Sequence, residues 1–399
     1  MGKKVPRSIC IFGANFMLEQ VIRLENEING ALDARDIEHI HRMRVASRRL
    51  RNAFEHFKDC FPKKTFKNWQ EDIRMITKSL GTARDLDIQI ERLSGLYNDS
   101  MDPGIKPGYQ RLLLRLKQRR AKAQEKVNKT LNRMREEKTL EKIRLGIKKL
   151  SIDTENVYLF TPALYQRSFN AINATLVDFL SHEEYIHSPE NVEELHAMRI
   201  AGKKLRYSIE LFAPIYKQTM IPYVQIMKDI QDQLGNIHDD DIWISWLPTF
   251  IVKEKKRITD FYGTSSPIDK LLPGIASLIE DRKNARSMEY QTFMATWKTH
   301  QDENTWPVLE NIINMPMRLE SILQDLSAEV EFDPEIEPVE DAAVDQKEEL
   351  AVEPVEEHGD EVEEAFDEAL EKPPAEIVGD SDDDKNVWVH LDEPPQTPG

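Results

Sequence analysis

The chain has 399 residues, of which 31% are charged and only 15 are glycine, a mixture typical of a helix-rich soluble protein. Its apolar runs all fall short of the ~20 residues that a membrane-spanning helix requires, so we expect no membrane association. The two cysteines, Cys10 and Cys60, cannot form a disulfide framework and match no metal-ligand spacing. They predict a reducing, cytoplasmic environment, without a metal or cofactor.

The net charge of −17 combines two unlike segments of the chain. Residues 325–399 hold 28 acidic and 3 basic side chains, whereas residues 1–324 hold 43 acidic and 51 basic ones. The basic body indicates an anionic partner. Residues 329–399 are predicted to form a disordered acidic tail, because their few large apolar side chains cannot offset the entropy lost on ordering.

Helical periodicity dominates the remainder of the chain, and no strand is predicted. The expected helices lie at about 10–32, 37–58, 65–98, 107–150, 163–181, 191–215, 220–247, 270–300 and 307–328. Breaks fall where proline and glycine occur, as at Asp102-Pro103-Gly104 and Ser266-Pro267. The pattern therefore predicts an all-α fold.

Two segments of the sequence occur twice. Residues 41–57 (HRMRVASRRLRNAFEHF) and 196–212 (HAMRIAGKKLRYSIELF) are identical at eight of 17 positions. Residues 80–93 and 234–247 are identical at seven of 14 positions, and the two offsets, 155 and 154, are nearly equal. Because order and spacing are kept, we infer an internal duplication, with a first repeat at 1–155 and a second at 156–328.

On a helical wheel the duplicated helix has one apolar face and one cationic face. The apolar positions are Met43, Ala46, Leu50, Phe54 and Phe57, and in the second copy Met198, Ala201, Leu205, Ile209 and Phe212. The polar positions are His41, Arg44, Arg48 and Arg51, and in the second copy His196, Arg199, Lys203 and Arg206, with Tyr207 beside His196. We expect each copy to bury its apolar face and to turn its cations outward.

A merely solvated face is the common role of such charges. However, four like charges at helical spacing repel one another unless an anion or an acidic partner compensates them. Each array also begins with a histidine, which can donate a hydrogen bond when neutral or charged. Since the pattern occurs in both copies, we predict an anion-binding site.

The segment 107–150 adds a longer basic stripe, about 33 Å long at ~1.5 Å per residue. Its members are Arg111, Arg115, Arg119, Lys122, Lys126, Lys129 and Arg133, and in the second half Arg282, Lys283 and Arg286 hold a weaker comparable position. A long stripe favours a linear polyanion, because single phosphates usually require a glycine-rich loop or one helix N-terminus. The secondary anion-binding candidates are Arg84, Arg115, Arg119, Lys122, Lys126, Arg282 and Arg286.

The motifs H-x-M-R-V-x-x-R-R-L-R at 41–51 and H-x-M-R-I-x-x-K-K-L-R-Y at 196–207, with the paired L-G-x-x-[RH]-D-x-D segments, resemble the CHAD family. The resemblance covers roughly residues 10–300. It implies two four-helix bundles related by pseudo-twofold symmetry, with a basic groove or pore that binds inorganic polyphosphate, and some members associate with polyphosphate granules. The implied ligands are His41, Arg44, Arg48, Arg49, Arg51, His196, Arg199, Lys203, Lys204 and Arg206.

The sequence departs from a symmetric pattern at one position, where Arg84 of the first copy corresponds to His238 of the second. The run from His238 to Asp241 could suggest a metal phosphohydrolase. Arginine cannot ligate a metal, and the E-x-E-x-K motif of the triphosphatase domain fused to some relatives is missing, so we predict binding without catalysis. We expect Asp85, Asp87, Asp239 and Asp241 to orient neighbouring arginine and lysine side chains instead.

Two other partners stay open at this stage. A nucleic acid would also bind basic stripes, but proteins that hold single strands usually supply aromatic rings for base stacking. The stripes contain few such rings, with Tyr207 the main exception. A scaffold for an acidic protein segment is the other alternative, and the chain's own tail, residues 330–393, could be a tethered competitor or only a solubilising segment.

Overall fold

The computed structural model describes residues 5–151 and 160–329, and within these ranges the chain is all-α, as predicted, with no strand. The first half contains α1 (Arg7–Asp33), α2 (Glu38–Phe57), η1 (Lys58–Cys60), α3 (Lys63–Asp99), α4 (Lys106–Glu136) and α5 (Thr139–Lys148). The second contains α6 (Pro162–Leu180), η2 (Glu183–Tyr185), α7 (Val192–Tyr216), η3 (Lys217–Met220), α8 (Ile221–Tyr262), η4 (Ser266–Lys270), α9 (Leu272–Asp302) and α10 (Thr305–Glu329). None of the helices in these ranges combines the length and the apolar character needed to cross a bilayer. The predicted tail and the boundary between residues 155 and 156 lie outside the described residues.

Two expected helix boundaries were wrong. The segment 107–150 is divided into α4 and α5 by a turn at Lys138, whose φ of 52° is left-handed. In addition, α8 continues past Pro248 to Tyr262, although the periodicity predicted an end at 247. An interior proline costs a helix about 3 kcal/mol. Here the continued burial of the apolar side chains of Phe250 and Ile258 offsets that cost.

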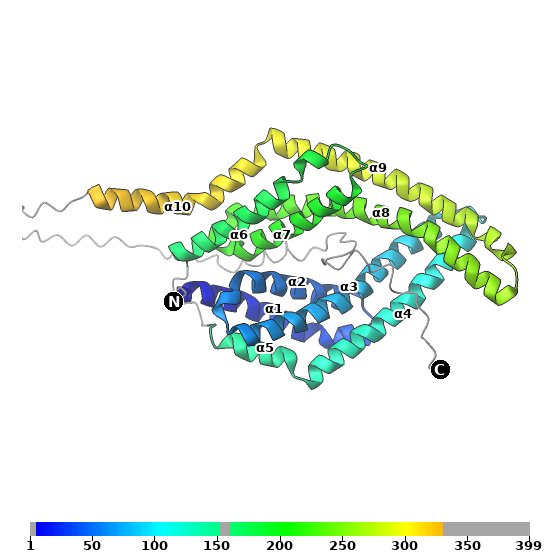
Figure 1. Cartoon of the computed structure of the whole chain (residues 1–399), viewed down its shortest axis with the longest axis horizontal. Helices are drawn as coiled ribbons and strands as arrows, with labels where there is room; N and C mark the ends of the chain where they lie inside the picture. The colour runs from blue at the N-terminus through cyan, green and yellow to red at the C-terminus, as the bar shows by residue number, and fades with distance from the viewer. Residues whose placement is uncertain (1–4, 152–159, 330–399) are drawn as a thin grey trace, which may run out of the picture.

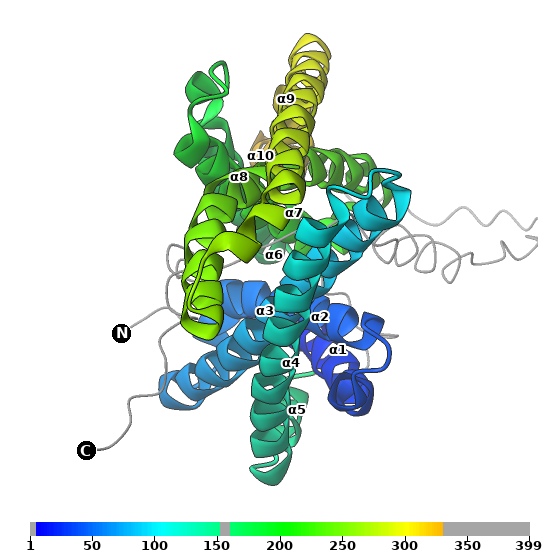
Figure 2. The same ribbon diagram turned by 90° about the vertical axis from the view of Figure 1, so that its right-hand side faces the viewer.

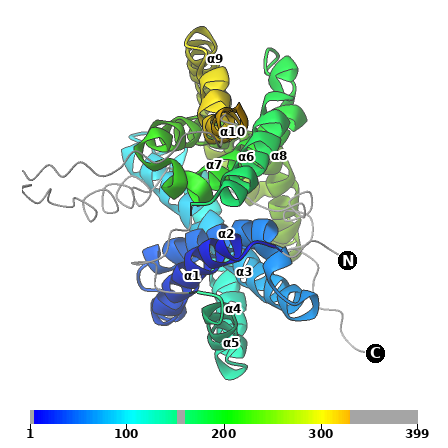
Figure 3. The same ribbon diagram turned by 90° about the vertical axis from the view of Figure 1, so that its left-hand side faces the viewer.

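The same pairs of helices pack together in the two halves. In the first half α1 packs against α2 and α5, and α3 packs against α2 and α4. In the second half α6 packs against α7 and α10, and α8 packs against α7 and α9. Each half therefore has five described α-helices where the resemblance implied four. Figure 1 and Figure 3 show α1–α5 on one side of the molecule and α6–α10 on the other. The pseudo-twofold relation itself stays a prediction.

The halves meet first where α2 packs against α7. The predicted apolar faces of both helices are confirmed, because all ten of their apolar side chains are at most 2% exposed. At one end of this boundary Phe12 of α1 stacks on Phe212 of α7 with ring centroids 6.0 Å apart, and Phe57 of α2 lies equally close to Phe212. These rings fix the two copies of the duplicated helix against each other.

The halves meet again where α4 crosses α9 (Figure 2). A β-carbon on Gly274 would lie 2.1 Å from the carbonyl oxygen of Ile105, and one on Gly108 would lie 2.5 Å from that of Leu271. Only glycine permits so close an approach of the two backbones. This crossing places the following turns of α4 beside the second half.

The cysteines correct the sequence analysis. Cys10 and Cys60 form a disulfide, with their Cα atoms 5.4 Å apart, although they are separated by 50 positions. Their spacing could not show this, because it is the α1–α2 hairpin that returns the chain to its beginning. Disulfides are typical of oxidising compartments. The cysteines therefore no longer support the predicted reducing, cytoplasmic environment.

Candidate anion-binding site

The polar faces of the duplicated helices face each other at the boundary between the halves. Arg48 of α2 donates a hydrogen bond from Nη1 to the hydroxyl of Tyr207 of α7 at 3.3 Å. Asn52 donates to the backbone carbonyl of the same tyrosine at 3.0 Å. The two motifs thus form one site that contains residues from both halves.

The cations of this site are buried, so the expectation that they point outward was wrong. The buried residues, each 1% to 7% exposed, are His41, Arg44, Arg48, Arg49, Arg199, Lys203 and Arg206, whereas His196 and Arg51 are half-buried. A helical wheel identifies a polar face but not what covers it. Here the polar face of α2 is covered in part by α7 and in part by α3, where Arg44 meets Asp85, and that of α7 also by α8, where Arg206 meets Gln231. Charges in such a place interact more strongly than they would in water.

A buried carboxylate that the sequence analysis missed joins the two arginine arrays. Glu210 of α7 accepts a hydrogen bond from Arg206 Nε at 2.6 Å and one from Arg49 Nε at 3.4 Å. Arg206 also donates from Nη1 to Gln231 of α8 at 3.2 Å. The repeat itself contained a signal, because the first copy has Glu55 at the equivalent position. Glu55 is nevertheless exposed, so the two copies use this residue differently.

The first L-G-x-x-R-D-x-D segment lies on α3 beside the site. An ion pair joins Arg44 to Asp85 at 3.5 Å, and another joins Arg84 to Glu38 at the same distance. Arg120 of α4 donates to Asp87. The prediction that Asp85 and Asp87 orient neighbouring cations is therefore confirmed.

The second segment, on α8, is built differently. The ring of His238 stacks on that of His196 with centroids 3.9 Å apart. Burial, and then the positive charges of Arg199 and other neighbouring groups, lower the pKa of His238 well below its ordinary value. The first half therefore has the cation Arg84 where the second has a neutral imidazole.

Asp239 does not orient a cation by a hydrogen bond, which contradicts the expectation for this residue. Its side chain is 1% exposed, and neither carboxylate oxygen has a hydrogen-bond partner in the part of the chain that the structure describes. Burial raises its pKa well above the usual range, although Arg199 and Arg92 oppose the shift. Asp240 orients neighbouring cations instead, because it lies 3.0 Å from Arg282 and 3.3 Å from Arg92.

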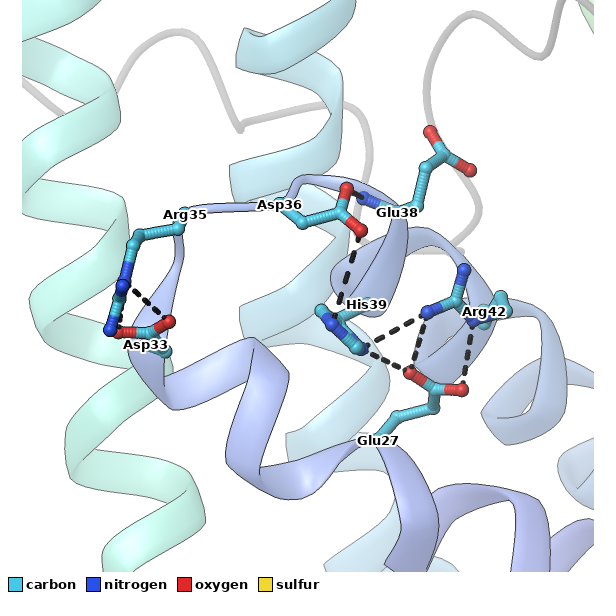
Figure 4. A network of polar contacts seen from close by, with 7 residues as sticks. All are labelled: Glu27, Asp33, Arg35, Asp36, Glu38, His39 and Arg42. Atoms are coloured by element: carbon cyan, nitrogen blue, oxygen red, sulfur yellow. Dashed lines mark hydrogen bonds and ion pairs between the residues drawn. The ribbon is translucent and has the colours of Figure 1, made fainter.

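A second polar network fixes the beginning of α2 (Figure 4). Glu27 of α1 accepts two hydrogen bonds from Arg42 at 2.8 and 3.1 Å and lies 2.6 Å from His39 Nδ1. Burial opposes ionisation, but the hydrogen bonds from Arg42 and His39 hold the pKa of Glu27 below its ordinary value. Asp36 accepts a hydrogen bond from the backbone N–H of Glu38 at 2.9 Å. These contacts orient the helical turn that carries His41.

The remaining predicted residues lie apart from this boundary. Lys204 is exposed and lies 3.5 Å from Asp178, on the outer side of α7. Lys122 and Lys126 are on the exposed face of α4. Arg119 lies over the ring of Trp246, 5.6 Å from its centroid. Arg115 contacts Glu254, Arg282 contacts Asp240 and Asp281, and Arg286 contacts Asp241, which confirms the orienting role expected of Asp241.

Candidate metal ligands do not cluster in this region. Over residues 5–151 and 160–329, no group of three or more His, Cys, Asp or Glu side chains is arranged to hold a metal ion. The arrangement observed is one of buried cations with a few carboxylates that orient them. Chemically, it can form charge-assisted hydrogen bonds to an anion.

Two solved structures share the fold of this chain. The crystal structure of the CHAD domain from the plant Ricinus communis superposes with a TM-score of 0.50 and 17% identity, covering 72% of this chain and 91% of that one. PptA from Streptomyces chartreusis superposes with a TM-score of 0.52 and 13% identity, covering 73% and 99%. A comparison with curated proteins finds no matching relative. The family model of the CHAD domain matches residues 16–248, which is more than half of the chain, and the protein therefore belongs to the CHAD family.

Proposed function

We propose that this protein binds inorganic polyphosphate, without catalysis, at the boundary between α2 and α7. The observation that supports this proposal most is the convergence of six buried cations from two copies of one helix: Arg44, Arg48, Arg49, Arg199, Lys203 and Arg206. A concentration of buried positive charge favours an anionic ligand, because charges interact more strongly where water is excluded. A phosphate chain supplies one negative charge per unit along its length.

The residue types suit that ligand. Arginine forks onto two oxygens of one phosphate, whereas lysine adds a less directional charge. His41 adds a buried donor at the same boundary. The pairs Arg44–Asp85 and Arg49–Glu210 hold guanidinium groups in place before a ligand arrives. Such pre-orientation reduces the entropy lost on binding.

A nucleic acid is the alternative ligand, since its phosphates would meet the same cations. Two aromatic side chains near the basic residues are already engaged. The hydroxyl of Tyr207 accepts from Arg48, and the ring of Trp246 is covered by Arg119. A polymer without bases fits this environment better than one that requires stacking platforms. Displacement of long-chain polyphosphate by RNA at equal phosphate concentration would favour the alternative.

The direct test is the double substitution Arg44→Gln and Arg199→Gln, measured by calorimetric titration with long-chain polyphosphate at low salt. Each substitution removes charge-assisted hydrogen bonds to the ligand. The affinity for polyphosphate is therefore expected to fall on the order of 10- to 100-fold. Lys204→Gln is the matched control, because Lys204 adjoins Lys203 in sequence but is exposed and lies beside Asp178, on the outer side of α7. Unchanged affinity of the double variant, with helix content preserved in both proteins, would refute the proposal.

A further inference from the structure

The duplication gives the protein two equivalent aspartates with different surroundings. Asp85 of α3 and Asp239 of α8 hold the same position in the second repeated segment. Arg44 of α2 and Arg199 of α7 are likewise equivalent in the H-x-M-R motif. In the first half Arg44 lies 3.5 Å from Asp85, whose side chain is 18% exposed. Among the described residues, Asp239 has no corresponding hydrogen bond.

The carboxyl group of Asp239 is buried without a hydrogen-bond partner. The residue is 1% exposed, and over residues 5–151 and 160–329 no group forms a hydrogen bond with either oxygen. Of the buried acidic side chains in these ranges, Asp239 alone lacks a partner at both oxygens. An unpaired buried polar group is costly, so most such groups in native proteins bond to protein, water or a ligand. This carboxyl group is therefore a candidate contact for the ligand.

Asp239 lies where α8 meets the cationic side of α7. The ring of His238, the preceding residue, stacks on that of His196 with centroids 3.9 Å apart. His196 and Arg199 are three positions apart and therefore share one side of α7. Arg199 is also the first of the arginines whose charge acts on Asp239. The carboxyl group thus adjoins a cation of the proposed polyphosphate site.

Charged groups from three helices act on Asp239. Burial disfavours its ionised form, whereas the positive charges of Arg199 of α7 and Arg92 of α3 favour that form. The negative charges of Asp85 of α3 and Asp240 of α8 add to the effect of burial. The balance raises the pKa of Asp239 well above its usual range. Asp239 therefore holds a proton at pH values where an exposed aspartate is ionised.

Two other nearby cations are partners of Asp240 or are absent by titration. Arg92 lies 3.3 Å from Asp240, and Arg282 of α9 lies 3.0 Å from the same carboxylate. Burial, and then the charge of Arg199, lower the pKa of His238 well below its ordinary value, so this ring is neutral. These groups do not compensate a negative charge on Asp239 by a direct contact.

A phosphate group bound by Arg199 would meet Asp239 in one of two forms. The carboxylate form only accepts hydrogen bonds, so it would repel phosphate oxygens. The neutral acid has an O–H group that can donate. A charged phosphate oxygen is a strong acceptor for such a donor. The neutral acid is thus the form of Asp239 that is compatible with a bound phosphate.

We propose that Asp239 is a further ligand-binding residue, which as a neutral carboxylic acid donates a hydrogen bond to a phosphate oxygen held by Arg199. The inference rests on the proposed function. Where Asp239 is ionised in the free protein, binding takes up one proton from solvent, and this proton stays on the carboxyl group. The two halves then use equivalent aspartates differently, because Asp85 orients Arg44 as a carboxylate.

The test is a calorimetric titration of the full chain with long-chain polyphosphate at low salt, between about pH 5 and 9. The affinity of the wild-type protein is expected to fall as the pH rises, by up to about tenfold per pH unit for one linked proton. Asp239→Asn keeps a donor that does not titrate. It should bind as the wild-type protein does at the acidic end and lose affinity less steeply. Other titrating groups are the same in both proteins, so the difference reports Asp239.

Asp239→Leu removes the donor and keeps a side chain of similar size. At the acidic end it should bind polyphosphate about tenfold more weakly than Asp239→Asn does, because a hydrogen bond to a charged group is lost. Asp229→Asn is the control, since Asp229 is an exposed carboxylate on the same helix that accepts from Gln225. This variant should retain the affinity and the pH dependence of the wild-type protein.

Two results would overturn the role of Asp239. If it is only a buried counter-ion of Arg199, Asp239→Asn tightens binding equally at every pH and keeps the slope of the wild-type protein. If a water molecule satisfies the carboxyl group, the Asn and Leu variants bind polyphosphate alike at the acidic end. Should Asp239→Leu fail to fold, the slopes of the wild-type protein and Asp239→Asn still decide, because equal slopes overturn the inference.

The Arg44→Gln, Arg199→Gln variant separates this inference from the proposed function. Its unchanged affinity for polyphosphate refutes the proposed function, and the inference with it. A weakened affinity in this variant, together with equal pH dependence in the wild-type protein and Asp239→Asn, overturns the role of Asp239 alone.

Discussion

Arg48 donates a hydrogen bond to the hydroxyl of Tyr207, a residue 159 positions later in the chain, at 3.3 Å. The donor belongs to the first copy of the duplicated helix and the acceptor to the second. This contact therefore ties the halves together within the site itself. The same contact packs the two halves together and orients the guanidinium group of Arg48.

Tyr207→Phe removes this acceptor and leaves the ring in place. The free energy of unfolding is expected to fall by about 1 kcal/mol, the usual net contribution of such a hydrogen bond. Urea denaturation followed by circular dichroism measures the change. The control is Tyr185→Phe at an exposed ring, where a change within about 0.5 kcal/mol is expected. Equal stability of both variants would contradict a stabilising role for the contact.

Salt should weaken polyphosphate binding steeply. Six buried cations predict a slope of roughly −4 in a plot of log affinity against log salt, taking ~0.7 per phosphate contact as for a single strand. The Arg44→Gln, Arg199→Gln variant should have a slope that is smaller by about 1.4, because two contacts are lost. Titrations at four salt concentrations between about 50 and 200 mM measure both slopes. Identical slopes for the two proteins would place the bound chain elsewhere.

The periodicity of the sequence predicted which apolar side chains of each helix are buried. It did not predict contacts that depend on the position of a second helix. The burial of Met43 and Leu50 followed from helical spacing, because packing of an amphipathic helix repeats every three to four residues. The burial of Arg44 did not follow, since its ion-pair partner Asp85 is on another helix, α3, 41 residues further along the chain. Glu210 was missed although it is part of the repeat, because its contact with Arg49 depends on the packing of α2 against α7.

Contacts between helices that are distant in the chain could not be predicted from the sequence either. Arg115 and Arg119 formed part of one predicted basic stripe with Lys122, yet Arg115 meets Glu254 while Lys122 is exposed. The stripe was inferred from α4 alone. Only the crossing of α4 over α9, which Gly108 and Gly274 allow, brings α8 beside its first turns. No pattern within one helix could have revealed that crossing.

His56, at the end of α2, should make stability depend on pH. Burial, and then the positive charges of Arg167 and Lys58, lower its pKa from 6.5 to about 4. Between pH ~6.5 and about 4, His56 therefore binds a proton in the unfolded chain but not in the folded chain. The contribution of His56 to the free energy of unfolding is complete above pH ~6.5 and decreases as the pH drops toward 4. His56→Gln should remove roughly 2 kcal/mol of that fall, since the ring is only partly buried.

Urea denaturation of both proteins at pH 7 and at pH 5 measures this difference. His182, at the end of α6, provides the control substitution His182→Gln, because it contacts neither Phe212 nor Ser208, the two residues of α7 that His56 meets. The control should retain the dependence of the wild-type protein. An equal pH dependence in His56→Gln would mean that the ring is protonated in the folded state.

The disulfide should contribute much of the stability of the first half. In the chain-entropy account, closing a loop of 50 residues stabilises the folded state by about 4 kcal/mol. Cys10→Ser with Cys60→Ser should lower the free energy of unfolding by an amount of this order. The bond itself is checked by thiol titration of the denatured, unreduced protein, where no free thiol is expected. Two free thiols would show that the cysteines stay reduced.

The acidic tail is expected to weaken polyphosphate binding because of its charge. Residues 1–324 hold 43 acidic and 51 basic side chains, whereas residues 325–399 hold 28 acidic and 3 basic ones. A tethered acidic segment has a high effective concentration near any cationic site on the same chain. We therefore expect truncation after Glu329 to tighten polyphosphate binding several-fold at low salt and much less at high salt, where the competition is screened.

A matched control replaces the acids of residues 330–399 by their amides and keeps the length of the segment. If charge is the cause, this variant should bind polyphosphate as tightly as the truncated chain does, because both lack the competing carboxylates. If only the truncation tightens binding, the tail obstructs the site by its bulk. A segment that competes for the same cations must lower their affinity for polyphosphate. Unchanged affinity in both variants would therefore show that the tail does not compete, and would leave it a solubilising role.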